Sequence, residues 1–484
     1  MVQVRAGQTE AADGPVEAGR QIRLNAFEMN AVGHIAHGLW RHPRDRATSY
    51  TDIGWWQDLA RILERGLFDG LFLADVSGIY DVYKGGPETA IAHAMQVPVN
   101  DPAMLVPAMA AVTRHLGFGI TANLSQEPPY LFARRMSTLD HLTRGRIAWN
   151  IVTGFLDSAA RGAGQGAQMD HDARYDRADE YMDLVYKLWE ASWDDDAVVS
   201  DRAAGIYARP DRVRAIHHHG RFFDLDAIHL SEPSPQRTPV LFQAGASARG
   251  LAFAATHAEC IFIPTTGRGS AAALTARIRA GVAAAGRRPR DVKILASLMT
   301  VIGRTAVEAR EKFEDYGRYA AAEAGLAQLA AATGIDFARF APDEPIVVAG
   351  EAGNGIRSLV AQLGAGDDGP PTVNRLLAGM TLGGRFKPVV GTSEQVADEI
   401  AAWIAEADID GFNLIRTVTP DCFTDVADLL VPVLQERGLY KHGYGDGTLR
   451  DRLFGQGPRP APGHPAAALR QPETPSSPAA EDRP

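Results

Sequence analysis

The chain has 484 residues, of which 45% are hydrophobic and 22% charged, and this is the composition of an ordinary globular protein with a large core. The net charge is −10 and no basic stripe is present, which argues against nucleic acid as a partner. No apolar run is long enough to predict a membrane span, and the polar residues 1–20 lack the apolar segment of a signal peptide.

The cysteines and histidines indicate neither disulfides nor a metal site. Cys260 and Cys422 lie far apart in apolar surroundings, which predicts reduced core thiols and a cytoplasmic protein. The consecutive His217, His218 and His219 would point to alternating faces of an extended chain, so they are poor chelators. We therefore expect no bound metal.

After an expected disordered arm over residues 1–20, buried segments with strand character recur along the chain. The predicted strands are 22–27, 68–74, 116–124, 146–152, 240–243, 259–263, 292–302 and 411–416. Segments with helical periodicity lie between and after them, at 55–65, 102–115, 129–142, 172–188, from 247, 271–285, 305–324, 392–407 and 423–437. Strands that alternate with helices predict a parallel sheet, and eight such pairs predict an α/β protein with a closed TIM (β/α)8 barrel.

Three stretches interrupt the alternation and are predicted as insertions after strands two, four and seven. They are residues 77–101, 194–239 and 326–391, and the second contains a predicted hairpin around Gly220. The barrel is therefore expected over residues 21–454. From 455 to 484 the sequence is dominated by Pro, Ala and polar residues, a composition that predicts a disordered tail.

Small polar residues gather where the predicted strands end. Asp75 follows strand two, Thr121 and Asn123 end strand three, and Asn150 lies near the end of strand four. Each alone is typical of a turn or a cap. Because the carboxyl ends of the strands form the active-site face of a β/α barrel, the group favours a shared site at the barrel mouth.

The run Gln-Ala-Gly-Ala-Ser at 243–247 leads from a strand into a helix. Small residues such as Ala246 let a ligand approach the backbone, and Ser247 begins a helix whose N-terminus offers unpaired N–H groups to a phosphate. Tyr175 in the first turn of the preceding helix can donate its hydroxyl to the same group, and His171 lies one turn earlier on the same side. These residues predict a phosphorylated cofactor held across two neighbouring loops. The chain has no P-loop, dinucleotide fingerprint or nucleophile elbow, so redox chemistry would need a borrowed cofactor.

Several longer runs resemble one family: LNAFEMNAVGHIAHGLWRHP, FDGLFLADVSGIYDVY, PVNDP, ARRMSTLDHLTRGRIAWNIVTG, HDARYDRADEY, EPSPQRTPVLFQAG and IDGFNL. They resemble the bacterial-luciferase-like flavin monooxygenases, and among these the nitrilotriacetate, dibenzothiophene-sulfone and long-chain-alkane monooxygenase group. The resemblance covers residues 22–455. It implies a TIM barrel that forms a homodimer or homotetramer, and a two-component system in which a separate NAD(P)H:flavin reductase supplies reduced FMN.

The resemblance also implies the chemistry and the site. FMNH2 reacts with O2, and the resulting flavin C4a-(hydro)peroxide oxidises a hydrophobic or aromatic small molecule. Phe27 falls where the family has an aromatic wall, and His34 is a candidate acid or base, although a histidine that only fastens its loop is equally open. The cofactor contacts implied by the family pattern are Asp75, Thr121, Asn123, Asn150, His171, Tyr175, Ala246 and Ser247.

Three positions depart from the alkane monooxygenase pattern. Ala31 replaces a cysteine, and Phe155 and Gln328 replace histidines, which predicts a more apolar substrate pocket lined by Phe27, Phe155 and Gln328. A flat aromatic substrate could stack on Phe155. Oxidative cleavage of riboflavin to lumichrome, as in riboflavin lyase, is therefore the leading alternative. A deazaflavin-dependent dehydrogenase and a non-catalytic flavin-binding protein remain open.

Overall fold

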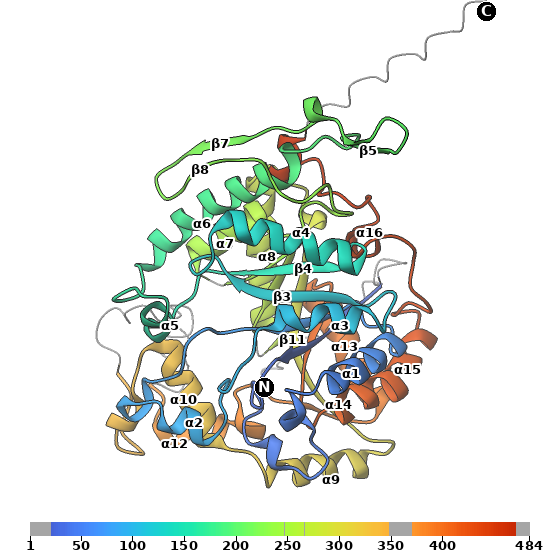
Figure 1. Cartoon of the computed structure of the whole chain (residues 1–484). Helices are drawn as coiled ribbons and strands as arrows, with labels where there is room; N and C mark the ends of the chain where they lie inside the picture. The colour runs from blue at the N-terminus through green and yellow to red at the C-terminus, as the bar shows by residue number, and fades with distance from the viewer. Residues whose placement is uncertain (1–20, 246, 266, 348–369, 471–484) are drawn as a thin grey trace, which may run out of the picture.

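The computed structural model describes residues 21–245, 247–265, 267–347 and 370–470. Parallel strands close into a barrel in which each strand pairs with the next along the chain and the last pairs with the first (Figure 1). The barrel strands are β1 Arg23–Met29, β2 Gly70–Ala74, β3 Gly117–Asn123, β4 Ile147–Val152, β9 Val240–Ala244, β10 Cys260–Ile263, β11 Lys293–Ile302 and β13 Gly411–Ile415. A short strand, β12 Val389–Gly391, extends the sheet beside the end of β11. The predicted TIM barrel is confirmed.

Successive side chains of a strand point to opposite faces, and β1 shows both environments. Leu24 and Ala26 pack with the surrounding helices, whereas Phe27 lies in the barrel interior. Its ring meets those of Phe72 and Phe262 edge to face, at centroid distances of 5.4 and 5.1 Å. Interlocked aromatic rings therefore fill the centre of the barrel and form a solid core, not a pore.

Helices cover the outside of the barrel (Figure 1). They are α1 Ile53–Arg65, α3 Val106–Ala110, α4 Pro129–Thr143, α6 His171–Tyr186, α7 Ala248–His257, α8 Arg268–Ala284, α9 Ala306–Gly317, α13 Ser393–Ala407, α14 Asp421–Asp425 and α15 Val431–Glu436. Helix α1 shows why they form: the Asp52 carboxylate caps the helix by accepting from Gly54 N, and residues at helical spacing, including Trp56 and Leu63, are buried against the strands.

Long connections follow β2, β4 and β11. The first holds α2 Glu88–Ala92, and the third holds α10 Ala322–Thr333 and α12 Val373–Gly379, which lie on the same side of the barrel as α2 (Figure 1). The second holds α5 Asp157–Gly162 and two hairpins, β5 Val198–Asp201 with β6 Ile206–Ala208, and β7 Ile216–His219 with β8 Asp224–Ala227. The predicted hairpin around Gly220 is confirmed, and along β7 the histidine side chains alternate between buried and exposed. Residues 348–369 of the third predicted insertion lie outside the described residues.

The expectation of a disordered tail is wrong for residues 455–470. This segment follows α16 Leu449–Phe454 and ends in the 3-10 helix η11 Pro465–Leu469. His464 is only 2% exposed, and its imidazole Nε2 hydrogen-bonds to the carbonyl oxygen of His257 at 2.8 Å. Specific polar contacts therefore hold a stretch whose composition alone predicts disorder. Residues 1–20 and 471–484, for which disorder was also expected, lie outside the described residues.

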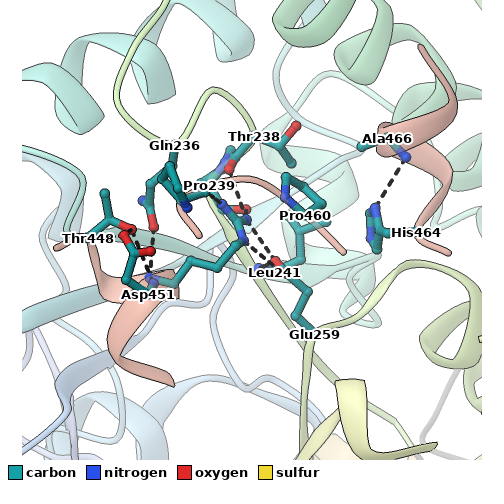
Figure 2. Close-up of polar contacts among 12 residues, drawn as sticks. Gln236, Thr238, Pro239, Leu241, Glu259, Thr448, Asp451, Pro460, His464 and Ala466 are labelled. Carbon is teal, nitrogen blue, oxygen red and sulfur yellow. Dashed lines mark hydrogen bonds and ion pairs between the residues drawn. The ribbon is translucent and has the colours of Figure 1, made fainter. Parts of the chain in front are cut away.

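A buried ion pair attaches the end of the chain to the barrel face opposite the mouth (Figure 2). Arg450 on α16 donates to both carboxylate oxygens of Glu259, which precedes β10, at 2.7 and 2.8 Å. The same guanidinium donates to the carbonyls of Thr238 and Pro239, just before β9. Burial alone would raise the pKa of Glu259, but the charge and hydrogen bonds of Arg450, together with His464 and the backbone N–H of Leu241, outweigh it and hold that pKa below its ordinary value. Both charges are thus paired and hydrogen-bonded, as burial requires.

Two further observations concern the predicted environment. Cys260 and Cys422 are buried free thiols, and burial raises the pKa of both well above the ordinary value. No helix in the described ranges combines the length and the apolar composition that crossing a bilayer would need.

Candidate active site

A cavity of about 330 Å³ opens where the barrel strands end. Its wall comes from the segments that follow β2, β3, β4, β9 and β10, so it occupies the carboxyl-terminal face on which β/α barrels build their active sites. Much of the wall is apolar, with side chains of Ile151, Leu156, Phe253, Pro264 and Leu274. The volume lies at the lower end of the range for small-molecule and cofactor pockets.

The structure brings most of the predicted site residues together in this cavity. The predicted residues that line it are Asp75, Thr121, Asn123, Phe155, His171, Tyr175 and Ser247. Ala246, a further predicted contact, lies outside the described residues. Residues from four separate β/α units therefore share one wall, as the positions of the strand ends indicated.

Two predicted residues from the β1 region do not reach the cavity. Phe27 belongs to the barrel interior, because its position in β1 directs it away from the helices. His34 is 2% exposed, with its ring 4.6 Å from that of Phe27 and its carbonyl oxygen accepting from Gln96 Nε2. Burial, together with the charge of Arg416, lowers the pKa of His34 well below its ordinary value. His34 is thus a neutral, buried residue that contacts Phe27 and lies outside the cavity wall.

Asn150 and Gln328 also lie outside the cavity wall. Asn150 donates through Nδ2 to Thr121 Oγ1 at 2.8 Å, so it orients a residue of the wall from behind. Gln328 on α10 lies with its Nε2 3.5 Å from the carbonyl oxygen of His34. Ala31 is fully buried and pairs with Val99 through an isolated β-bridge. Of the three departures from the alkane monooxygenase pattern, only Phe155 therefore meets the cavity.

One end of the cavity, called the anion end below, carries groups that can bind an anion. Ser247 caps α7 by accepting from Gly250 N at 3.0 Å. A Cβ on Gly250 would lie 2.8 Å from Tyr175 Oη and 2.9 Å from Ser247 Oγ, so the two hydroxyls converge on the first turn of α7. His171 begins α6, and its ring lies 5.3 Å from that of Tyr175. Two helix N-termini and two hydroxyl groups thus meet at this end, the arrangement that stabilises a phosphate.

The protonation state of Tyr175 is consistent with this description of the anion end. Burial raises the pKa of Tyr175, although its interactions with Ser247 and Thr153 partly offset the increase. The hydroxyl therefore remains protonated over the physiological range and is available as a donor. Arg174, 4% exposed, lies behind this end and donates to the carbonyl oxygen of Met169.

Asp75 stands between this cavity and a second one. The second cavity, of about 450 Å³, shares Asp75, Thr121 and Asn123 with the first, and its wall also contains charged groups that include Asp101 and Glu127. Burial, and then the negative charge of Asp101, raise the pKa of Asp75 to about 6. A carboxyl group with such a pKa in a cavity wall can hold or release a proton near neutral pH.

Two basic residues of the wall were not predicted from the sequence. Arg174 lies three residues after His171, so helical spacing could have placed it on the same side. Arg385 reaches the cavity from the connection that precedes β12, in the run Gly-Gly-Arg-Phe-Lys, where neither periodicity nor a strand end gives a signal. Gln243 lines the cavity as well, from β9 at the start of the run 243–247 that was singled out for its small residues.

A largely apolar cavity with an anion end, at the mouth of a closed parallel barrel, defines a cofactor-dependent (β/α)8-barrel enzyme. Comparison with known proteins is more specific, because the family described as luciferase-like monooxygenases matches residues 38–410. The chain belongs to this family, and it is a flavin-dependent monooxygenase.

The similar proteins span nearly the whole chain. A long-chain alkane monooxygenase of Geobacillus thermodenitrificans is 47% identical over 440 residues, which are 90% of this chain and 95% of that protein. A dimethyl-sulfide monooxygenase of Hyphomicrobium sulfonivorans is 46% identical over 453 residues, covering 93% and 94%. The crystal structure of a riboflavin lyase with modified FMN and the substrate riboflavin is 37% identical, with a TM-score of 0.87 over 93% of this chain and 100% of that chain.

Proposed function

We propose that the protein is the oxygenating component of a two-component system. It takes reduced FMN from a separate NAD(P)H:flavin reductase and uses O2 to oxidise a hydrophobic small molecule, as a long-chain-alkane-type monooxygenase does. The observation that carries this proposal is the convergence of Tyr175, Ser247 and the first turn of α7 at one end of the mouth cavity. The hydroxyls and the helix N–H groups at this end would hold the phosphate of FMN.

The rest of the wall fits the ring of such a cofactor. Gln243 Oε1 and Thr265 Oγ1 are buried in the wall and have no hydrogen-bond partner within the described ranges. Buried polar atoms are rarely left unpaired, and the flavin pyrimidine ring offers both donors and acceptors for them. Asp75, Thr121 and Asn123 line the same cavity and can bind the ring edge.

When bound, reduced flavin supplies the electrons that activate dioxygen. The residues of the chain bind the cofactor, exclude water from it and provide a proton. Apolar side chains such as Ile151, Leu156 and Phe253 exclude water from the reacting face. Asp75 replaces His34 as the candidate acid or base, because its carboxyl group holds a proton at Oδ up to about pH 6 and faces a second, polar cavity through which that proton can exchange.

Flavin binding tests the anion end directly. Anaerobic fluorescence titrations compare FMN with riboflavin, which lacks the phosphate. We expect wild-type protein to prefer FMN, and Ser247→Ala and Tyr175→Phe to reduce that preference about 10-fold while riboflavin binding stays unchanged. Ser270→Ala is the matched control, because Ser270 is an exposed serine in the first turn of α8 and lies outside the cavity. If Ser247→Ala keeps the full preference, the phosphate is not held there.

Turnover tests the reaction. The protein is coupled to an NADH:FMN reductase in air, and mass spectrometry follows long alkanes, dimethyl sulfide, aryl sulfones, aminopolycarboxylates and riboflavin. Oxygenated product that incorporates ¹⁸O from ¹⁸O₂ and disappears without oxygen supports the proposal. Reduction or oxidation of a substrate without oxygen would instead indicate a dehydrogenase, and tight flavin binding with no product from any substrate would indicate a flavin-binding protein.

Riboflavin cleavage is the second candidate, and Phe155 favours it. This ring lies in the cavity wall and packs beside Leu156 and Ala159, so it offers an aromatic face to a flat substrate. In the same coupled assay, lumichrome as the main product would select this function. Phe155→Leu should then raise the KM for riboflavin and leave FMN affinity unchanged.

A further inference from the structure

Arg385 is a charged group in the cavity wall, and no residue that the structure describes neutralises it. Its guanidinium lines the cavity, and within the described ranges it has neither an ion pair nor a hydrogen bond. The Arg385 guanidinium lies over the ring of the adjacent Phe386, with its carbon 5.1 Å from the ring centroid, in a cation–π contact. By contrast, Arg174 in the same wall donates to a backbone carbonyl.

The segment that carries Arg385 is firmly placed. Leu382 and Phe386 on either side are buried, and Thr381 Oγ1 donates to the carbonyl oxygen of Phe386 at 3.2 Å. Gly383 has a φ of +76°, and a Cβ there would overlap the carbonyl oxygen of His37 in the loop after β1. This close approach requires glycine and fixes the turn against the barrel. The guanidinium is therefore presented to the cavity by a packed turn and not by a free loop.

No charge among the described residues offsets the burial of Arg385. Burial lowers the pKa of Arg385 to about 10, and no neighbouring charge contributes to the change. Removing a guanidinium from water without providing a counter-charge costs free energy. A bound oxyanion would offset that cost, because a guanidinium binds carboxylates and similar oxyanions in a planar, bidentate geometry.

We propose that Arg385 binds an oxyanion on the substrate, so that the preferred substrate has an apolar body and a terminal carboxylate or sulfonate. This inference rests on the proposed function, in which the flavin phosphate occupies the separate Tyr175–Ser247 end. Arg385 holds the substrate head group, while the apolar wall of Ile151, Leu156 and Leu274 receives its body. Arg385 is thus a specificity-determining residue that distinguishes amphipathic anions from neutral hydrocarbons.

Calorimetric titration with matched probes tests this proposal. Decanoate, octanesulfonate and neutral 1-decanol are titrated into wild-type protein, Arg385→Gln, Arg385→Lys and Lys387→Gln, each with and without bound FMN. Lys387 is the control, because it is an exposed cation two residues further along the same segment. We expect the two anions to bind wild type at least 10-fold more tightly than 1-decanol, and Arg385→Gln to weaken them about 10- to 100-fold without affecting 1-decanol. Arg385→Lys should retain part of the preference, and Lys387→Gln all of it.

The outcomes separate the possible roles of Arg385. Equal binding of anions and 1-decanol by wild type would overturn the proposal. A loss of the FMN-over-riboflavin preference in Arg385→Gln would also overturn it, because Arg385 would then hold the flavin phosphate. A lower melting temperature with loss of all binding would make Arg385 structural, whereas removal of an unpaired buried charge should leave the melting temperature unchanged or higher. If FMN fails to bind at all, the proposed function fails, and the titrations of flavin-free protein still decide the role of Arg385.

Discussion

Replacing Asp75 by Asn should stabilise the folded protein, and the effect should depend on pH. The pKa of Asp75 is raised from 3.8 to about 6 in the folded state, so the folded protein holds this proton more tightly than the unfolded chain. The free energy of unfolding therefore falls as the pH rises through the window from about 4 to 6. At 1.36 kcal/mol per pKa unit, the full penalty above that window is about 3 kcal/mol. Asparagine cannot ionise and avoids the penalty.

Urea denaturation of wild type and Asp75→Asn at pH 4.5 and pH 7.5 measures this effect. The advantage of Asp75→Asn should grow by about 2 kcal/mol between the two pH values. Asp211→Asn is the control, because the Asp211 side chain is 78% exposed and should show no such growth. A stability advantage of Asp75→Asn that stays constant with pH would refute the conclusion that burial raises the pKa of Asp75. The same substitution should slow turnover, which would show that the unfavourable burial of the Asp75 carboxylate is kept because the enzyme needs this group for activity.

Three further substitutions test other parts of the structure. Arg450→Met leaves the buried Glu259 carboxylate without its partner and should destabilise the fold by about 3–5 kcal/mol in thermal or urea denaturation. The control Arg61→Met removes one partner of an exposed ion pair and should change stability by about 0–1 kcal/mol. Equal effects would show that the buried ion pair contributes no more to stability than the exposed one. Because the folded-state pKa of Glu259 is lowered, that contribution is present above its ordinary pKa of 4.5 and is lost as the pH falls. Gly250→Ala should weaken FMN binding about 10-fold in fluorescence titrations because its Cβ would crowd Tyr175 Oη, while Gly281→Ala, with ordinary contacts, should not. His464→Ala removes the hydrogen bond to the His257 carbonyl and the cap on Ala466 N, so it should cost about 1–3 kcal/mol of stability. It should also speed cleavage by elastase after Ala466 or Ala467, and unchanged cleavage would mean that other contacts hold the segment.

The barrel and most of the site were predictable from the sequence because both follow from local patterns. Buried strands that alternate with amphipathic helices define the fold, and the active-site face follows from where those strands end. Asp75 and Thr121 were therefore found from position alone. Tyr175 and Ser247 were predicted because each lies at the start of a helix, where its position in the sequence determines that its side chain is near the helix N-terminus.

The errors arose where tertiary contacts override local pattern. Phe27 and His34 lie in and just after the first strand, close in sequence to the barrel mouth. The side chain of Phe27 nevertheless points into the barrel interior, because successive residues of a strand face opposite sides, and His34 packs against Phe27. Arg385 had no local signal, because its position depends on a turn that fits against His37, far earlier in the chain. The composition of residues 455–470 predicts disorder, but composition cannot predict individual buried contacts such as the hydrogen bond of His464.

The pairing of β1 with β13 also sets the order in which this protein can be assembled. Asn25 on β1 donates to Asn413 on β13, and 388 residues separate them. A ribosome adding about 5–20 residues per second needs about 20–80 s to deliver that partner. Throughout this interval β1 has an open edge, which other chains can join. High-yield expression should therefore depend on chaperone capacity and slow, cool induction, and any nonsense mutation before residue 411 should produce aggregate instead of a smaller enzyme.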